Sequence, residues 1–252
     1  MKPICIIPAR GDSKGVSKKN IRKIMGKPLI AYTIERSIKS NIFSHVVVST
    51  EDEEIAKISR KFGAIVPFVR PKRLATDNAT ADDVLVHAVQ KLLGLGFKFD
   101  IMVWRDCTVP FIRNKDVKRS IRLLKEKKAN LVIGVYNQHL NPYYNILEYT
   151  KTKNLKLCKK LSQRPKSRQN APKVFQMNGL HTFNVKKFLF PKRKIRTEIS
   201  KAILLEIPIE SGLMIDTEFE FQLTKLIIEN QHEYFTGENY TKIRRRWWME
   251  LT

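Results

Sequence analysis

The stretch PICIIPARGDSKGVSKKN, residues 3–20, decides the fold. Its first half, residues 3–9, is apolar and has the composition of a short buried strand, and its second half is a glycine-bearing loop. Doubly wound sheets bind ligands in such a loop at the carboxyl end of a parallel strand. Gly11 and Gly15 would let backbone N–H groups approach an anion. The cations of the loop that favour a triphosphate are Arg10, Lys14 and Lys19.

The spacing of the glycines excludes the two commonest nucleotide-binding loops. The stretch matches neither GxxxxGK[ST] nor GxGxxG, which disfavours an ordinary P-loop ATPase and a dinucleotide enzyme. Taken by itself, a loop of glycine and lysine is also compatible with a solvated basic turn. The context of the loop must decide between these readings.

Downstream of the loop, apolar runs alternate with amphipathic segments. Helical spacing is found in residues 29–40, 51–62, 82–93 and 116–127, and strand-like runs occupy residues 45–49, 64–69, 99–104 and 130–135. This alternation predicts an α/β protein with a mostly parallel sheet that is covered by helices on both faces. The run at 64–69 contains a proline and is expected to be an edge strand.

The alternation stops after Gln138. Residues 142–172 are basic and weakly periodic, which predicts an inserted arm of antiparallel strands and loops within a single domain spanning residues 1–252. Strand-like runs return at residues 174–175, 180–185 and 202–207, and a last helix is expected at 217–228.

The composition limits the class of protein but does not identify its binding partner. Lys and Arg number 48 against 24 Asp and Glu, a formal charge of +24, and 42% of the residues are hydrophobic, so a disordered basic tail is excluded. The basic balance permits nucleic-acid binding, binding of acidic small molecules, or a lysine-rich solvated surface. The lysines are dispersed along the chain, so the charge alone names no partner.

The same composition indicates a cytoplasmic protein. No apolar stretch reaches the ~20 residues of a membrane helix, and no signal peptide is recognisable, so a membrane partner is not expected. Cys5, Cys107 and Cys158 are too few and too scattered for a disulfide framework or a zinc site. None of the five histidines has the spacing of a metal ligand or a catalytic triad.

IPARGDSKGVSKKN followed by GKPLIAYTIE strongly resembles the N-terminal signature of the CMP-sialic acid synthetases, the acylneuraminate cytidylyltransferases. The resemblance continues in family order between residues 7 and 221 through VVVSTEDEEIA, VRPKRLATDNAT, TVPFIR, RQNAPKVFQMNG and IDTEFEF. It implies a Rossmann-like α/β fold of the nucleotide-diphospho-sugar transferase type. It also implies a homodimer in which a small arm reaches over the partner, and residues 142–172 stand where that arm would lie.

The implied reaction joins CTP to an acidic nine-carbon sugar. The anomeric hydroxyl of a nonulosonic acid attacks the α-phosphorus of CTP in line, which gives a CMP-sugar and pyrophosphate. Two anions must meet in this reaction, so cationic side chains and a divalent metal are needed to offset their repulsion.

The resemblance assigns the nucleotide-binding roles residue by residue. Lys14 matches the electrostatic catalyst near the leaving group, and Asn20 matches a residue that meets the sugar of the nucleotide. Arg70 and Thr80 match positions that line the cytidine site, although Arg70 in a surface ion pair is the alternative. The implied catalytic residues are Arg10, Lys14 and Lys19, and the implied CTP-binding residues are Ala9, Arg10, Gly11, Ser13, Asn20, Arg70 and Thr80.

A second group of residues is implied for the acidic sugar. Arg168, Gln169, Asn178 and Gly179 match the segment that shapes the sugar pocket, and Asn178-Gly179 as a plain hairpin turn is the alternative. Tyr144, in NPYYNILE, stands where N-acetylneuraminate enzymes often have a lysine. This segment, with Asp106 ahead of Thr108, looks more like relatives that act on legionaminic or other 5,7-diamino nonulosonates, because tyrosines suit acetamido and methyl groups.

The chain departs from the family at the metal site. The family often has Asp-Ile-Asp, whereas this chain has Met214-Ile215-Asp216. Mg²⁺, or another divalent cation, often takes only one or two carboxylates and fills its other positions with phosphates and water, so Asp216 alone could suffice. Asp106 stands where sialic acid enzymes commonly have Gln. We hypothesise that Asp106 and Asp216 face the same Mg²⁺–CTP, the alternative being that Asp106 accepts hydrogen bonds from the sugar.

Three other functions remain to be weighed. A 3-deoxy-manno-octulosonate cytidylyltransferase usually carries Ser-x-Arg in the loop, and Ser13-Lys14-Gly15 fits the sialic type better. A nucleic-acid-binding protein is suggested by the charge and by the arginines and tryptophans of residues 244–248, but a tail cluster can equally cap the fold. An inactive relative is suggested by Met214.

Overall fold

The computed structural model describes residues 1–12, 15–189 and 201–230. Its centre is a six-stranded sheet in the order β10-β6-β9-β5-β1-β4. The strands are β1 (Ile4–Pro8), β4 (Val46–Ser49), β5 (Ile101–Arg105), β6 (Leu131–Asn137), β9 (Phe175–Asn184) and β10 (Ile203–Glu206). Only β9 runs against its neighbours β5 and β6, and the other pairs in this sheet are parallel. The prediction of a mostly parallel α/β sheet is confirmed.

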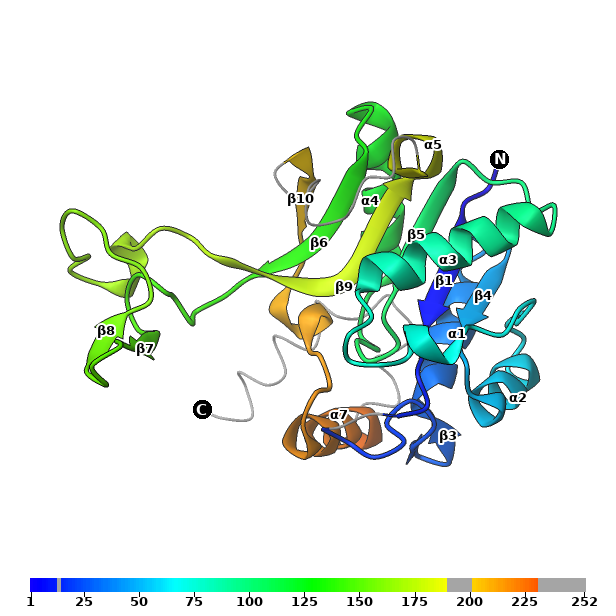
Figure 1. Ribbon diagram of the computed structural model, residues 1–252, viewed down its shortest axis with the longest axis horizontal. Coiled ribbons are helices and arrows are strands. Elements are labelled where there is room, and N and C mark those ends of the chain that lie inside the picture. Colours follow the sequence, from blue (N-terminus) through cyan, green and yellow to red (C-terminus); the bar gives the residue numbers. More distant parts are fainter. Residues whose placement is uncertain (13–14, 190–200, 231–252) are drawn as a thin grey trace.

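Helices cover both faces of this sheet (Figure 1). One face packs on α1 (Leu29–Lys39), α2 (Glu53–Lys61) and α4 (Asn114–Glu126), and the other packs on α3 (Ala81–Gly94). Along α1, apolar residues recur at helical spacing, so Ile30 and Ile34 are both completely buried against the sheet. The two apolar clusters lie on opposite faces because successive residues of a strand point to opposite sides: Cys5 and Ile7 of β1 join one cluster, and Ile4 and Ile6 join the other.

Smaller elements surround the sheet. β2 (Lys23–Ile24) pairs with β3 (Lys27–Pro28), and β7 (Leu147–Tyr149) pairs with β8 (Leu155–Leu157). Short helical elements are η1 (Lys72–Leu74), η2 (Arg168–Asn170), α5 (Val185–Leu189) and η4 (Ile209–Gly212), and the last described helix is α7 (Glu218–Asn230). Within the described residues, no helix is both long enough and apolar enough to cross a membrane.

The hairpin of β7 and β8 projects away from the sheet at the end of two extended connections (Figure 1). These connections are the continuations of β6 and β9, so the projecting segment includes the predicted arm, residues 142–172. Both strands of the hairpin are largely exposed.

Three predicted strand runs differ from the observed strands. Residues 64–69 do not form a strand: only Ile65 makes a parallel bridge, to Val47, because Pro67 has no N–H to continue the ladder. The predicted runs at 174–175 and 180–185 are one continuous strand, β9. Asn178 and Gly179, considered above as a hairpin turn, lie inside that strand, where its register with β6 shifts.

Candidate active site

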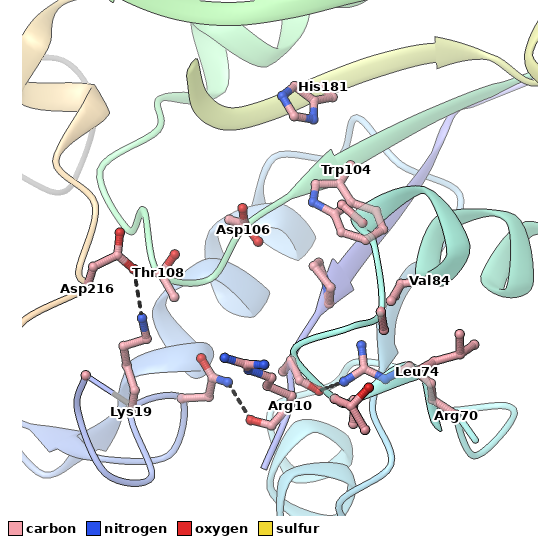
Figure 2. A pocket seen from close by; sticks show the side chains of 18 residues that line it. Arg10, Lys19, Arg70, Leu74, Val84, Trp104, Asp106, Thr108, His181 and Asp216 are labelled. Carbon is pink, nitrogen blue, oxygen red and sulfur yellow. Dashed lines mark hydrogen bonds and ion pairs between the residues drawn. The ribbon is translucent and has the colours of Figure 1, made fainter. Parts of the chain in front are cut away.

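A cavity of about 380 Å³ opens at the carboxyl ends of β1 and β5 (Figure 2). The loop after β1 forms one wall, residues 70–84 form another, and the ends of β5 and β9 form the floor. Of the residues predicted for the site, those that line this cavity are Ala9, Arg10, Lys19, Asn20, Arg70, Asp106 and Asp216. The structure therefore brings together positions that span most of the sequence.

The loop after β1 is fixed by its own side chains. Asn20 is buried, its Nδ2 donates to the Arg10 carbonyl over 2.9 Å, and its Oδ1 lies 3.1 Å from Cys107 Sγ. Gly15 packs so closely on the carbonyl of Asp216 that a Cβ there would fall well inside the 3.0 Å that real Cβ atoms keep. Asn20 thus holds the loop in shape, and Gly15 brings the loop against the segment that carries Asp216.

Arg70 is not a surface residue. It is 4% exposed, and its guanidinium donates to Glu51 Oε2 over 2.5 and 3.1 Å and to the Ala9 carbonyl over 3.0 Å. The other oxygen of Glu51 accepts the N–H of Gly11 over 2.8 Å. The Gly11 N–H therefore already donates to a carboxylate, and a phosphate would have to displace Glu51 to reach it.

The described cations of the loop hold carboxylates across the cavity. Lys19 Nζ donates to the Ile215 carbonyl and lies 3.2 Å from Asp216 Oδ1 (Figure 2), and Arg10 pairs with Asp77 over 3.1 Å. In both pairs the carboxylate is exposed, so the pairs are worth little to stability and a triphosphate can compete for the cations. Ser13 and Lys14, the other predicted residues of the loop, lie outside the described residues.

Asp106 lies on the floor of the cavity, directly after β5. Its N–H donates to the Gly179 carbonyl over 3.0 Å, and a Cβ at Gly179 would stand 2.7 Å from the Asp106 Cβ, so glycine is needed beside it. The pKa of Asp106 is raised to about 6: burial raises it most and the charge of Asp216 also raises it, against the lowering effects of Lys19 and of a hydrogen bond from Trp104. The two carboxylates repel each other across the same small space.

A divalent cation bound to both carboxylates would offset this repulsion. The N–H of Ile215 donates to the Thr108 carbonyl over 3.0 Å, which brings Asp216 beside the loop that carries Asp106. In the described part of the chain no group of three or more acidic, His or Cys side chains is arranged so that it could hold a metal ion. Two carboxylates suffice for Mg²⁺ when phosphate and water supply its other ligands. Asp106 and Asp216 therefore fit a divalent cation that arrives with a polyphosphate.

Several predicted residues lie elsewhere. Thr80 does not line the cavity; its hydroxyl caps α3 by accepting the Asp83 N–H over 3.2 Å. Tyr144, Arg168 and Gln169 lie on the projecting segment, where the last two are exposed. Asn178 is completely buried, with its Oδ1 accepting the Leu180 N–H over 3.2 Å, so it supports the floor instead of facing the cavity.

His181 and Trp104 line the cavity but were not assigned to it from the sequence. They are register partners on β9 and β5, so their side chains lie on the same face of the sheet. Burial lowers the pKa of His181 to about 4, so the ring is neutral at pH 7. Only the pairing of β5 with β9, which joins distant parts of the sequence, could have identified them. Burial raises the pKa of the nearby Cys107 thiol to about 12, so Cys107 is not a thiolate nucleophile at neutral pH.

Comparisons with known proteins identify the family of the chain. The cytidylyltransferase family model matches residues 4–245. The CMP-N,N'-diacetyllegionaminic acid synthase of Campylobacter jejuni is 30% identical over 227 residues, which cover 89% of this chain and 94% of that protein. A pseudaminic acid cytidylyltransferase of the same species is 44% identical over 117 residues, 46% of this chain and 50% of that protein.

Among solved structures, CMP:2-keto-3-deoxy-manno-octonic acid synthetase complexed with CTP has a TM-score of 0.67 and 16% identity, and covers 92% of this chain and 100% of its own. At that identity the likeness concerns the fold alone. The family match, in contrast, runs over nearly the whole sequence. The chain belongs to the cytidylyltransferase family.

Proposed function

We propose that this protein is a CTP:nonulosonate cytidylyltransferase, which converts CTP and an acidic nine-carbon sugar into a CMP-sugar and pyrophosphate. The observation that carries the proposal is that Lys19, Arg10, Asp106 and Asp216 all line one cavity. Such a site places cations for a triphosphate beside carboxylates for its metal ion. The names of the relatives, which act on pseudaminic and legionaminic acids, support the choice of a nonulosonic acid as the second substrate.

Different residues of the site have different roles in the reaction. In the reaction, a bond forms between the anomeric oxygen of the sugar and the α-phosphorus, and the bond from that phosphorus to pyrophosphate breaks. Lys19 and Arg10, released from Asp216 and Asp77, would stabilise the charge on the phosphates, and Lys14 is proposed from the resemblance for the leaving group. Mg²⁺ held by Asp106 and Asp216 would supply further positive charge to the same oxygens.

The framework of the site holds these groups in place. Arg70, tied to Glu51 and to the Ala9 carbonyl, fixes the end of β1 where the cytidine is proposed to bind. Asn20 fixes the loop through its hydrogen bond to the Arg10 carbonyl. Pre-set geometry of this kind lowers the cost of bringing two anions together.

We propose a homodimer for the residues that remain outside the cavity. Tyr144, Arg168 and Gln169 lie on the projecting segment, which extends away from the sheet (Figure 1). On its hairpin, Leu147, Tyr149 and Leu155 are 53%, 74% and 61% exposed and share one face, because Tyr149 pairs with Leu155 and Leu147 is two residues away. A second copy of the chain would cover that face and bring the sugar-binding residues to a site.

The function is tested by measuring pyrophosphate release. The purified protein is mixed with CTP, Mg²⁺ and, in separate reactions, pseudaminic, legionaminic, N-acetylneuraminic and 3-deoxy-manno-octulosonic acids. We expect release with one of the three nine-carbon sugars, no release when UTP replaces CTP, and no release when the metal is chelated. Release with the eight-carbon acid alone would overturn the choice of sugar, and no release with any of the four would indicate the inactive relative that Met214 suggests.

A further inference from the structure

Arg105 carries a charge into the core of the protein. It is the last residue of β5, it is completely buried, and it lies beneath α1. Its Nη1 donates to Ser37 Oγ over 2.9 Å, and its Nη2 donates to the Ile112 carbonyl over 3.1 Å. Its Nε has no hydrogen-bond partner among the described residues.

The surroundings of Arg105 do not balance this charge. The ion pairs found in the described part of the chain include no carboxylate on Arg105. A second cation, Arg36, lies close enough that the charge of Arg105 lowers its pKa, after the larger effect of burial. A buried charge without an acidic partner costs stability, and an apolar side chain of similar length would pack there at a lower cost. The guanidinium is therefore poorly explained as a stabiliser of the core.

Its contacts point instead to the loop that carries the active-site carboxylate. Residue 105 immediately precedes Asp106, and the carbonyl that its side chain binds belongs to Ile112, so the guanidinium joins the two ends of the loop 106–112. Arg36 donates to the same carbonyl over a longer distance, 3.3 Å. The Arg105 guanidinium also anchors this loop to α1 through its hydrogen bond to Ser37.

The loop in turn sets the distance between the two carboxylates of the site. Asp106 is its first residue, and the Thr108 carbonyl accepts the N–H of Ile215, the residue before Asp216. A shift of the loop would therefore move Asp106 directly and Asp216 through this hydrogen bond. Small displacements of such groups cost large factors in rate.

We propose that Arg105 is a positioning residue for the transfer reaction. Its guanidinium joins the two ends of the loop 106–112 and thereby fixes the positions of Asp106 and Asp216 relative to each other. The proposal rests on the proposed function for its effect on turnover, but its effect on the loop is independent of that function. The proposal also predicts different effects on stability and on activity. Removing the charge removes a desolvation cost from the core, whereas losing the hydrogen bond to Ile112 lets the loop move.

The test replaces Arg105 with an apolar side chain of similar length. In Arg105→Met we expect a melting temperature equal to or above that of the wild type, because the buried charge is gone. Hydrogen–deuterium exchange without substrates should be at least ten-fold faster at the amides of residues 107–109, 111 and 112 and at Ile215. With CTP, Mg²⁺ and the accepted sugar, kcat should fall at least ten-fold while the KM for CTP changes by less than three-fold.

Two further variants make the outcome decisive. Arg119→Met removes an exposed arginine of α4 and should leave exchange in the loop and turnover unchanged. Arg105→Lys keeps the charge but has no planar fork, so the loop should still exchange faster than in the wild type. A large drop in the melting temperature of Arg105→Met, or wild-type exchange in the loop of either Arg105 variant, would overturn the proposal. An inactive wild type would refute the proposed function, and the exchange and melting measurements would still decide the role of Arg105.

Discussion

Lys18 and Lys19 are adjacent in the sequence but occupy opposite environments. The Lys18 side chain is 69% exposed and pairs with Glu54 on the surface, whereas the Lys19 side chain is 12% exposed and reaches Asp216 and the Ile215 carbonyl. In the sequence the two lysines are indistinguishable, and only the turn of the loop separates their environments. They form a matched pair of variants for testing electrostatic catalysis.

We expect Lys19→Met to lower kcat/KM for CTP by tens- to hundreds-fold, the ~2–4 kcal/mol of one charge-assisted contact in the transition state. Lys18→Met should stay within about two-fold of the wild type, because an exposed pair contributes little. Pyrophosphate release measured at several CTP concentrations checks both values. Equal losses in the two variants would mean that general charge, and not the position of Lys19, drives the reaction.

His181 makes the stability of the protein depend on pH. Its folded pKa of about 4 lies below the ordinary value of 6.5, so between these values the unfolded chain binds a proton that the folded chain excludes. Its contribution to stability is complete above pH 6.5 and is lost as the pH falls toward 4. At pH 5 the loss amounts to about 2 kcal/mol relative to pH 7.

The substitution His181→Gln removes this titration. We expect the urea-unfolding free energy of the wild type to fall by about 2 kcal/mol more than that of His181→Gln between pH 7 and pH 5. The comparison cancels the titration of the other groups, which the two proteins share. Parallel pH profiles for the two proteins would show that the ring is not kept neutral by burial.

At the scale of elements, α3 shows how a predicted ligand contact became a helix cap. Thr80 and Asp83 form a reciprocal capping box at the start of α3, and the helix packs its buried face on the sheet beside the cavity. The sequence pattern around residues 69–80 pointed to a segment that lines the cavity. It did not show that the Thr80 hydroxyl was already used by the backbone.

We expect Thr80→Ala to lower the unfolding free energy by about 1 kcal/mol, the usual cost of a lost cap. Thr80→Ser should retain most of that stability, because a serine hydroxyl can accept the same hydrogen bond. The KM for CTP should change by less than two-fold in Thr80→Ser. A ten-fold increase in that KM with unchanged stability in Thr80→Ala would instead support the direct contact with cytidine that the resemblance implied.

β9 is the element that the sequence described least well. The strand runs for ten residues and pairs with two neighbours, yet it contains Asn178 and Gly179, which favour turns. Gly179 has a φ of +76°, and the space beside Gly134 is taken by the Asn178 side chain. Both glycines are needed because Asp106 and Asn178 occupy the room that a Cβ would take. Such crowding arises only after strands distant in sequence have paired.

At the scale of the whole molecule, the projecting segment is the part with the least contact to the sheet (Figure 1). Its apolar hairpin face leads to the expectation of a homodimer. We expect the paired change Tyr149→Glu and Leu155→Glu to convert a dimer into a monomer in light scattering after size exclusion, because buried charges destabilise an interface.

The control for this prediction changes the other face of the hairpin. Glu148→Gln together with Lys156→Gln removes the surface ion pair, which lies on the opposite side, and should leave the mass unchanged. A monomeric wild type at micromolar concentration would refute the dimer. If the monomeric variant kept full turnover, Tyr144, Arg168 and Gln169 would have no role in the site.

The sequence by itself determined the class of fold, the family and the cation-rich loop. These depend on local properties: apolar runs of strand length, helical spacing and a continuous series of motifs. The tertiary structure alone decided which side chains meet. Asn20 and Arg70 turned out to fix the backbone of the site, His181 entered the cavity through the pairing of β9, and Arg105 closed a loop through its buried fork. The physical reason is that hydrogen bonds and burial are settled between residues far apart in the chain, where no local pattern records them.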